Sequence, residues 1–289
     1  MHLSATRQIL CREIVDSDVS DTTDLLVQGF PRRRRQYWLN GFLRLANHPR
    51  PRGSPKYGYV LECNGTLVGV ILLITSSIRV GNTQTIRCNL SSWFVAPAFR
   101  AFSPLLISRA TSSENVTYVN VSPAPHTWPI IETQGFSRYG NGQFFAVPAL
   151  RAPSSRTRVV EVDRTRDIPF GPFERDLLLA HSGYGCLSLW CSDAEGIYPF
   201  VFAPRMIKGT IPCIQLIYCR GIGDYVRFAR PLGWHFASRG RPLVIIDSNE
   251  PIPGLTGWYF ENLMPKYFKG PERPRLGDLA YTEAALFGF

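Results

Sequence analysis

The sequence lacks the long hydrophobic run that a membrane-spanning helix requires. Its longest apolar stretch extends from Leu67 to Ile74, whereas a spanning helix needs about 20 apolar residues. The first residues, MHLSATRQILCRE, contain no apolar core of the length found in secretory signal peptides. With 45% hydrophobic and 19% charged residues, the composition is typical of a packed soluble protein, and we expect it to lie in the cytoplasm.

The spacing patterns of metal sites are also missing. The seven cysteines include no Cys-x-x-Cys pair, and the five histidines include no His-x-x-x-His pair. An odd number of loosely spaced cysteines, several of them within apolar runs, indicates buried free thiols. We therefore predict that the protein has no metal site.

Acidic residues are absent between Asp24 and Glu62, where the chain carries eight basic residues. Together with the net charge of +10, this basic stretch favours an anionic partner, and nucleic acid is the less favoured kind. Four of the arginines are consecutive, Arg32 to Arg35, at the predicted start of a helix. Such a run usually forms a solvated face, but it opposes the helix dipole, so a negatively charged partner would stabilise it.

The apolar pattern predicts strands and helices in two successive sets. In the first set, Asn64-Gly65 joins two strand-like runs, and this pair tolerates the positive φ angles of a type I′ turn. We expect the other elements of this set at 18–30, 32–45 and 104–110 (helices), 85–95 and 116–121 (strands), 129–133 (a short helix) and 135–147 (a closing pair of strands).

A polar, proline-containing segment, residues 149–157, predicts a linker, after which the order of elements begins again. We expect the second set at 158–162, 214–219 and 243–247 (strands), 173–181 and 225–238 (helices), around 193–196 (a hairpin), and at 266–268 and 279–286 (a terminal pair). The shared order indicates a weak internal repeat. The predicted fold class is α/β with mixed sheets, in two domains, residues 1–150 and 151–289.

Two short motifs carry a family resemblance: FVAPAFR at 94–100 and ETQGFSRYG at 132–140, in this order after the Asn-Gly hairpin. Residues 11–148 resemble the GNAT superfamily of acyl-CoA-dependent N-acyltransferases, and residues 158–289 look like a more diverged copy. The resemblance implies that each domain is a mostly antiparallel twisted sheet flanked by helices. It also implies an acyl-CoA co-substrate, most simply acetyl-CoA.

In the family, the splayed end of the fourth strand pairs with the pantetheine arm, and the following loop points N–H groups at the pyrophosphate. The positions of this sequence that match are Phe94, Val95, Arg100, Ala101, Phe102, Ser103 and Leu105. Ser103 and Leu105 stand where the family has glycine. We expect Ser103 to cap the next helix, with Pro104 following it and Arg100 compensating for the N–H group that proline lacks. The second copy keeps an arginine and two glycines in Cys219–Gly223, so either copy could bind the cofactor.

The tyrosine that the family often uses as general acid is replaced by Ile131. The nearest candidates are Tyr118 and Ser122, with His126 and Glu132 as further possibilities, although positioning a neutral amine beside the thioester can suffice. The first helical region borders the acceptor site in the family, which implies that Arg33, Tyr37 and Trp38 bind a small or acidic acceptor. The two aromatic residues fit a core stripe as well.

The resemblance thus implies direct transfer of an acyl group from acyl-CoA to an amine. Two alternatives stay open. One is a non-catalytic binding or regulatory protein of the same fold. The other is an aminoacyl-tRNA-dependent transferase similar to the peptidoglycan-bridge enzymes, although these normally have a larger chain and a tRNA-contacting insertion.

Overall fold

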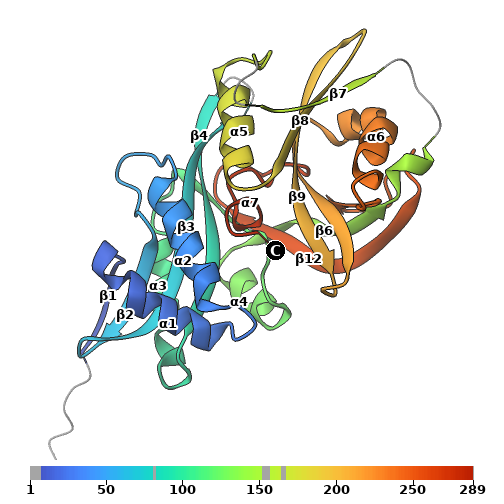
Figure 1. Ribbon diagram of the computed structural model, residues 1–289. Helices are drawn as coiled ribbons and strands as arrows, with labels where there is room; N and C mark the ends of the chain where they lie inside the picture. The colour runs from blue at the N-terminus through green and yellow to red at the C-terminus, as the bar shows by residue number, and fades with distance from the viewer. Residues whose placement is uncertain (1–7, 81–82, 152–156, 164–166, 289) are drawn as a thin grey trace, which may run out of the picture. The chain divides into compact units, whose positions relative to one another are not determined.

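The computed structural model describes residues 8–80, 83–151, 157–163 and 167–288 (Figure 1). Its contacts divide the chain into two compact units, residues 1–120 and 121–289. This division falls within the first predicted domain, and the assignment of residues 1–150 and 151–289 to two repeats stays a prediction. Residues 152–156 of the predicted linker lie outside the described residues.

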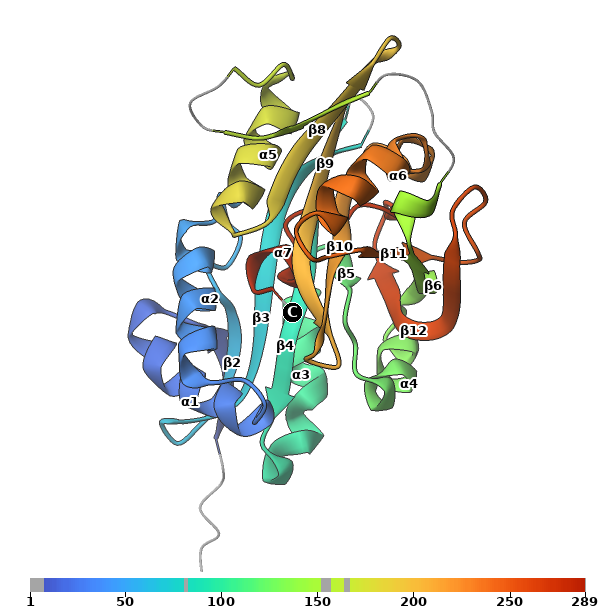
Figure 2. The ribbon, with the colours of Figure 1, turned by 45° about the vertical axis from the view of Figure 1, so that its right-hand side comes forward.

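The first unit contains five strands in the order β1-β2-β3-β4-β5. All neighbours are antiparallel except β4 and β5, which are parallel. The strands are β1 (Ile9–Glu13), β2 (Gly58–Cys63), β3 (Thr66–Val80), β4 (Thr83–Val95) and β5 (Val116–Asn120). The helices are α1 (Val19–Gly29), α2 (Arg35–Asn47) and α3 (Ser103–Ala110), with 3₁₀ turns η1 (Asp16–Asp18) and η2 (Pro97–Phe102). Figure 2 shows α2 and α3 on opposite sides of these strands.

The predicted hairpin turn is confirmed. Asn64 and Gly65 join β2 to β3 with φ angles of 49° and 79°, as a type I′ turn requires. This turn fixes the register in which Cys63 faces Thr66. The mixed α/β class and the predicted helices of this unit are confirmed as well.

One buried histidine ties the segment after α2 to the sheet. His48 Nε2 lies 3.2 Å from the carbonyl oxygen of Thr75 and 2.9 Å from the hydroxyl oxygen of Ser76 on β3. Burial lowers the pKa of His48 to about 4. The ring is therefore neutral at pH 7, and Nε2–H can donate to the Thr75 carbonyl.

Glycine at position 29 allows α1 to approach β4 closely. A Cβ atom on Gly29 would lie 2.4 Å from Cγ of Phe94, which is far inside van der Waals contact. The end of α1 therefore packs directly against the ring of Phe94. This contact places the segment that follows α1 beside the end of β4.

The second unit contains seven strands in the order β12-β6-β11-β10-β9-β8-β7. They are β6 (Ser137–Ala146), β7 (Arg158–Glu161), β8 (Leu187–Asp193), β9 (Gly196–Ile207), β10 (Ile211–Cys219), β11 (Leu243–Ser248) and β12 (Gly257–Lys269). The helices are α4 (Trp128–Thr133), α5 (Pro172–Gly183), α6 (Ile222–Ala237) and α7 (Glu283–Leu286). In this unit, only the β10–β11 pair is parallel among the described strands.

The amphipathic helix α6 covers the main core of the second unit. Its Phe228, Leu232 and Phe236 are buried in one cluster with Phe202 and Val244 from the strands. Burial of a side chain of this size contributes about 2 kcal/mol. None of the described helices is long and apolar enough to cross a membrane.

Two expectations at the ends of the repeats are wrong. The region predicted as a closing pair at 135–147 is one strand, β6, and its neighbours β11 and β12 come from far along the chain. The predicted terminal pair is also replaced, because β12 spans Gly257–Lys269 and residues 283–286 form α7. Both errors arise because the apolar faces of these segments are paired with partners distant in sequence.

The low pKa of His48 predicts acid sensitivity. The unfolded chain binds a proton on this ring below about pH 6.5, whereas the folded protein resists it until about pH 4. The free energy of unfolding should therefore fall as the pH drops through this window, by up to about 3 kcal/mol. Urea denaturation at pH 7 and pH 4.5 measures the loss. His48→Gln should flatten the dependence and the exposed control His126→Gln should not; equal slopes in all three proteins would contradict the assignment.

The contact between α1 and Phe94 predicts an unusual cost for a helix glycine. Gly29→Ala should lower the free energy of unfolding by about 1–2 kcal/mol, because the new methyl group collides with the Phe94 ring. Gly223→Ala is the matched control, since a Cβ at that helix position meets no atom within 4 Å. It should be neutral or slightly stabilising. Chemical denaturation of both variants measures their free energies of unfolding. A value for Gly29→Ala equal to that of the unmodified protein would disprove the contact.

Candidate functional site

The parallel strands β4 and β5 pair over a short distance and then separate. Their pairing extends from Ile86 and Val116 to Asn89 and Val119, whereas β4 continues to Val95. We call Leu90–Val95 of β4, together with the end of β5, the first fork. Within it β4 bulges against β3, because Ser91 faces Leu72 and Phe94 faces Val70, and Ser92 has a φ of 51°. The bulge adds a residue to β4 and bends it at this point.

The side chain of Asn89 lies where the two strands separate. Its Nδ2 donates to the carbonyl oxygens of Leu90 on β4 and Val119 on β5, each at 3.1 Å. The residue is 1% exposed. Buried carbonyl groups need a donor, and at this position one carboxamide serves both strands.

The backbone angles of the junction after β4 explain why it contains no glycine. The 3₁₀ turn η2 runs directly into α3, and every φ from Trp93 to Ala110 is negative, so no position there needs glycine. Ser103 is not the helix cap that we expected. It has helical angles, and its N–H donates to the carbonyl of Arg100. Because a 3₁₀ turn uses its N–H groups in i to i+3 hydrogen bonds, this junction offers a ligand fewer backbone donors than an open loop.

The junction presents an exposed arginine and two partly exposed apolar side chains. Arg100 is exposed, and the sequence contains no acidic residue between Glu62 and Glu114. Phe102 and Leu105 beside it are 38% and 45% exposed, whereas Val95 is buried.

The predicted acceptor residues form one cluster at the start of α2. The guanidinium carbon of Arg33 lies 4.5 Å from the centre of the Tyr37 ring, and Tyr37 contacts Trp38 edge to face at 4.9 Å. Trp38 is 3% exposed and packs against Phe30 in a tilted arrangement, with ring centres 5.3 Å apart, so it belongs to the core. Phe30 follows Gly29, which contacts Phe94, so the cluster is connected to the first fork through α1.

A second fork occurs between β10 and β11. Their pairing ends at Gln215 and Ile245, whereas β10 continues to Cys219. Here the backbone edge of β10 that β11 leaves unpaired is hydrogen-bonded by a later segment of the same chain. The N–H of Leu279 donates to the Ile217 carbonyl at 2.7 Å, and the N–H of Cys219 donates to the Gly277 carbonyl at 3.0 Å.

We call residues 275–281 the strap. Its fit to the second fork is close: Gly277 has a φ of 75°, and a Cβ there would lie 2.8 Å from the sulfur of Cys219. Arg275 stacks on the Tyr218 ring at 5.1 Å, and the N–H of Tyr281 donates to His181 Nε2 at 3.0 Å. The strap is therefore an integral part of the second unit.

The junction after β10 is electrically compensated. Arg220 donates to both carboxylate oxygens of Glu174 at 2.6 Å, and this pairing raises the pKa of Arg220. Asp224 lies in the first turn of α6 and adds a negative charge near Gly221. An anion would meet less attraction here than at Arg100.

The two candidate catalytic residues belong to different units. Tyr118 is buried, and its phenolic oxygen accepts a hydrogen bond from the N–H of Ser113, just beyond α3, at 3.0 Å. Burial raises the pKa of Tyr118, which makes it a weaker acid. Ser122 donates its hydroxyl hydrogen to the carboxylate of Glu283 in α7. His126 and Glu132 are exposed.

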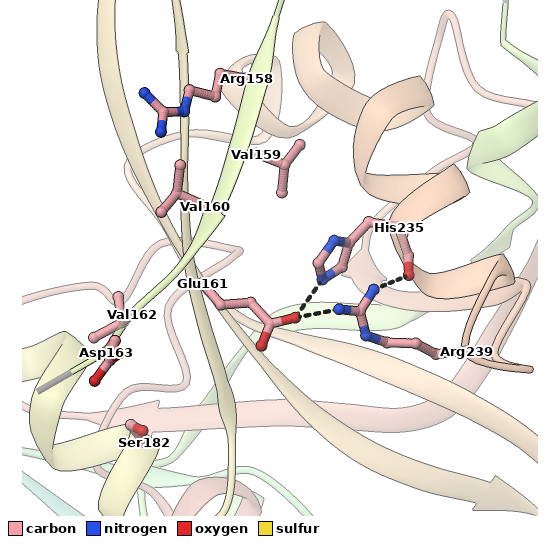
Figure 3. Close-up of a pocket in the computed structure, with 9 residues that line it drawn as sticks. All are labelled: Arg158, Val159, Val160, Glu161, Val162, Asp163, Ser182, His235 and Arg239. Atoms are coloured by element: carbon pink, nitrogen blue, oxygen red, sulfur yellow. Dashed lines mark hydrogen bonds and ion pairs between the residues drawn. The ribbon is translucent and has the colours of Figure 1, made fainter. Parts of the chain in front are cut away.

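A pocket of about 740 Å³ lies beside β7 at the C-terminal end of α6 (Figure 3). Glu161 points toward Arg239 and His235, with its Oε1 at 2.6 Å from Arg239 Nη2 and 3.1 Å from His235 Nε2, and Arg158 points away. Burial, and next the charge of Arg239, lower the pKa of His235 despite Glu161. Since Gly221 is at the opposite end of α6, this pocket is remote from the second fork.

Metal ligands do not gather in the part of the chain that the structure describes: it contains no group of three or more His, Cys, Asp or Glu side chains placed to bind an ion. Three features of the forks escaped the sequence analysis, namely Asn89, the contact of Gly29, and the strap. Asn89 had a weak signal, since it is a carboxamide next to the apolar Leu90 within a predicted strand. The strap had none, because its pairing with β10 depends on distant backbone groups.

No protein family profile matches the sequence, and no curated relative matches it. Solved structures, in contrast, match this chain in fold. A GCN5-related N-acetyltransferase from Anabaena variabilis superposes with a TM-score of 0.59 at 10% identity, over 90% of this chain and 72% of that one. A candidate acetyltransferase from Pyrococcus horikoshii gives 0.56 at 12% identity, over 94% and 93%.

A GCN5-related N-acetyltransferase from Kribbella flavida also gives a TM-score of 0.56 at 12% identity, over 91% of this chain and 71% of that one. Likeness at such low identity is evidence of fold. The agreement extends over nine tenths of the chain or more in all three comparisons. The chain therefore has the fold of the GCN5-related N-acetyltransferases, the GNAT fold that the sequence resemblance predicts.

Proposed function

We propose that the protein transfers an acyl group, most simply acetyl, from acyl-CoA to an amine acceptor, and that the first fork binds the cofactor. The fold makes acyl transfer the leading hypothesis, because its solved neighbours include N-acetyltransferases. In this proposal the pantetheine arm lies along Phe94 and Val95 of β4. The diphosphate lies at Arg100–Ser103, with Leu105 beside it.

The observation that carries this assignment is the difference between the two forks. Residues 277–279 already hydrogen-bond to β10 where an extended ligand would pair in the second fork. Arg220 is also neutralised by Glu174. The first junction, in contrast, presents the exposed Arg100 in a stretch without acidic residues. One cofactor per chain, at the first fork, follows from this difference.

The reaction is a direct transfer within a ternary complex. The acceptor nitrogen forms a bond to the thioester carbonyl carbon, the carbon–sulfur bond breaks, the amine loses a proton, and CoA leaves as the thiol. Holding the two reactants together supplies much of the rate enhancement. The roles of Tyr118 and Ser122 as proton donors stay predictions.

Calorimetric titration with CoA and acetyl-CoA tests the cofactor site. We expect one equivalent to bind, and Arg100→Glu to weaken binding at least tenfold, because a charge contact to the diphosphate worth about 1.4 kcal/mol or more is replaced by repulsion. Arg220→Gln, which removes the compensated arginine of the second junction, should leave affinity unchanged.

The outcomes separate the two copies. Loss of binding only in the Arg220 variant would move the cofactor to the second fork and contradict the proposal. Failure of the unmodified protein to bind either compound would overturn the acyl-CoA function altogether. Thermal denaturation of each variant confirms that the folded protein is compared.

The cluster of Arg33, Tyr37 and Trp38 supports an acceptor with a negative charge. Arg33 is half-buried against the Tyr37 ring, and Arg32 and Arg34 beside it are exposed. Arg33→Ala should raise KM for an acidic amine several-fold and leave KM for acetyl-CoA unchanged, because a surface charge contact contributes about 1 kcal/mol. Arg35→Ala is the control, since Arg35 is already paired with Asp24 at 2.8 Å. An equal rise in both variants would contradict this role.

A non-catalytic binding protein is the second candidate function. It is favoured by the burial of Tyr118 and by the 3₁₀ turn that replaces an open loop before α3. CoA binding without acetylation of any amine in a panel that includes acidic acceptors would support it.

A further inference from the structure

The first fork contains a polar side chain at the point where its strands part. Asn89 is the last residue of β4 that pairs with β5, and its partner there is Val119. Its carboxamide nitrogen donates to one carbonyl on each strand, those of Leu90 and Val119, at 3.1 Å each. It thus supplies both strands with a donor at the end of the parallel ladder.

This arrangement differs from that of the second fork, where backbone groups of the strap satisfy β10. Separation of two paired strands leaves buried carbonyl groups that need hydrogen bonds, and each unmet one costs about 1–3 kcal/mol. In the first fork a side chain meets this need at the branch point without another strand. The spacing of β4 and β5 beyond Asn89 then depends on that side chain.

We propose that Asn89 is a positioning residue that sets the opening of the first fork and thereby the fit of the pantetheine arm. This inference rests on the proposed cofactor site and adds a residue that the sequence motifs do not include. Asn89 acts through the two backbone carbonyls and needs no contact with the cofactor. Its effect is confined to the part of the ligand that lies along β4, while the nucleotide half lies at the Arg100 junction.

The test compares two ligands, CoA and adenosine 3′,5′-bisphosphate, which has the nucleotide half and lacks the pantetheine arm. Asn89→Asp keeps the shape of the side chain but replaces the donor by an oxygen that faces two carbonyls. Its affinity for CoA should fall about tenfold or more, as expected for the loss of two buried hydrogen bonds. Its affinity for the bisphosphate should stay within about twofold, since the junction is unchanged.

Two further variants keep the test decisive. Asn89→Ala deletes the amide without burying a charge, and it replaces Asn89→Asp if that variant does not fold. Thr85→Val is the matched control on the same strand, because the buried hydroxyl of Thr85 has no hydrogen-bond partner among the described residues. It should bind both ligands as the unmodified protein does.

The results distinguish this inference from the proposed function. A selective loss of CoA affinity supports positioning by Asn89. Unchanged CoA affinity, or an equal loss for both ligands, overturns it, because a merely structural role lowers both together. If the unmodified protein binds neither ligand, the proposed cofactor site fails and this inference fails with it.

Discussion

A parallel strand pair that ends early imposes a hydrogen-bonding requirement on each unit of this protein. β4 parts from β5 after Asn89, and β10 parts from β11 after Gln215. Buried backbone groups at such a branch cannot be left without partners. The first unit meets the requirement with a carboxamide, and the second with a segment of its own backbone. The two units therefore differ in how the branch is satisfied.

The charged residues beside the two forks differ as well. The first junction lies in a stretch of the sequence with arginines and no carboxylates, and its Arg100 is exposed. At the second junction, Glu174 and Asp224 compensate Arg220. Both units contain a parallel strand pair followed by a helix, but the arginine after β4 is exposed, whereas the arginine after β10 is paired with a carboxylate.

Local features were predicted well from the sequence, and distant pairings were not. Asn64-Gly65 specified a hairpin because two adjacent residues determine the turn, and the helices near 19–29 and 35–47 followed from apolar spacing. The partners of β6 could not be foreseen, since many strands have a similar alternation of side chains. For the site, the motif located the β4 junction, but the continuous 3₁₀ turn before Ser103 depends on backbone angles that the sequence does not specify. The strap could not be predicted, because it pairs through backbone N–H and carbonyl groups, which are present in every sequence.

The position of β6 has a consequence for how the chain acquires its structure during synthesis. This strand lies between β11 and β12, so both of its neighbours emerge from the ribosome on the order of 100 residues later. Strands β1 to β5 pair in order within the first 120 residues, so this unit can fold first. β6 must wait with its backbone edges unpaired, which are the groups that promote aggregation. Pairing of β6 with strands so distant in sequence is slow. It is therefore the step at which a chaperone would have its greatest effect.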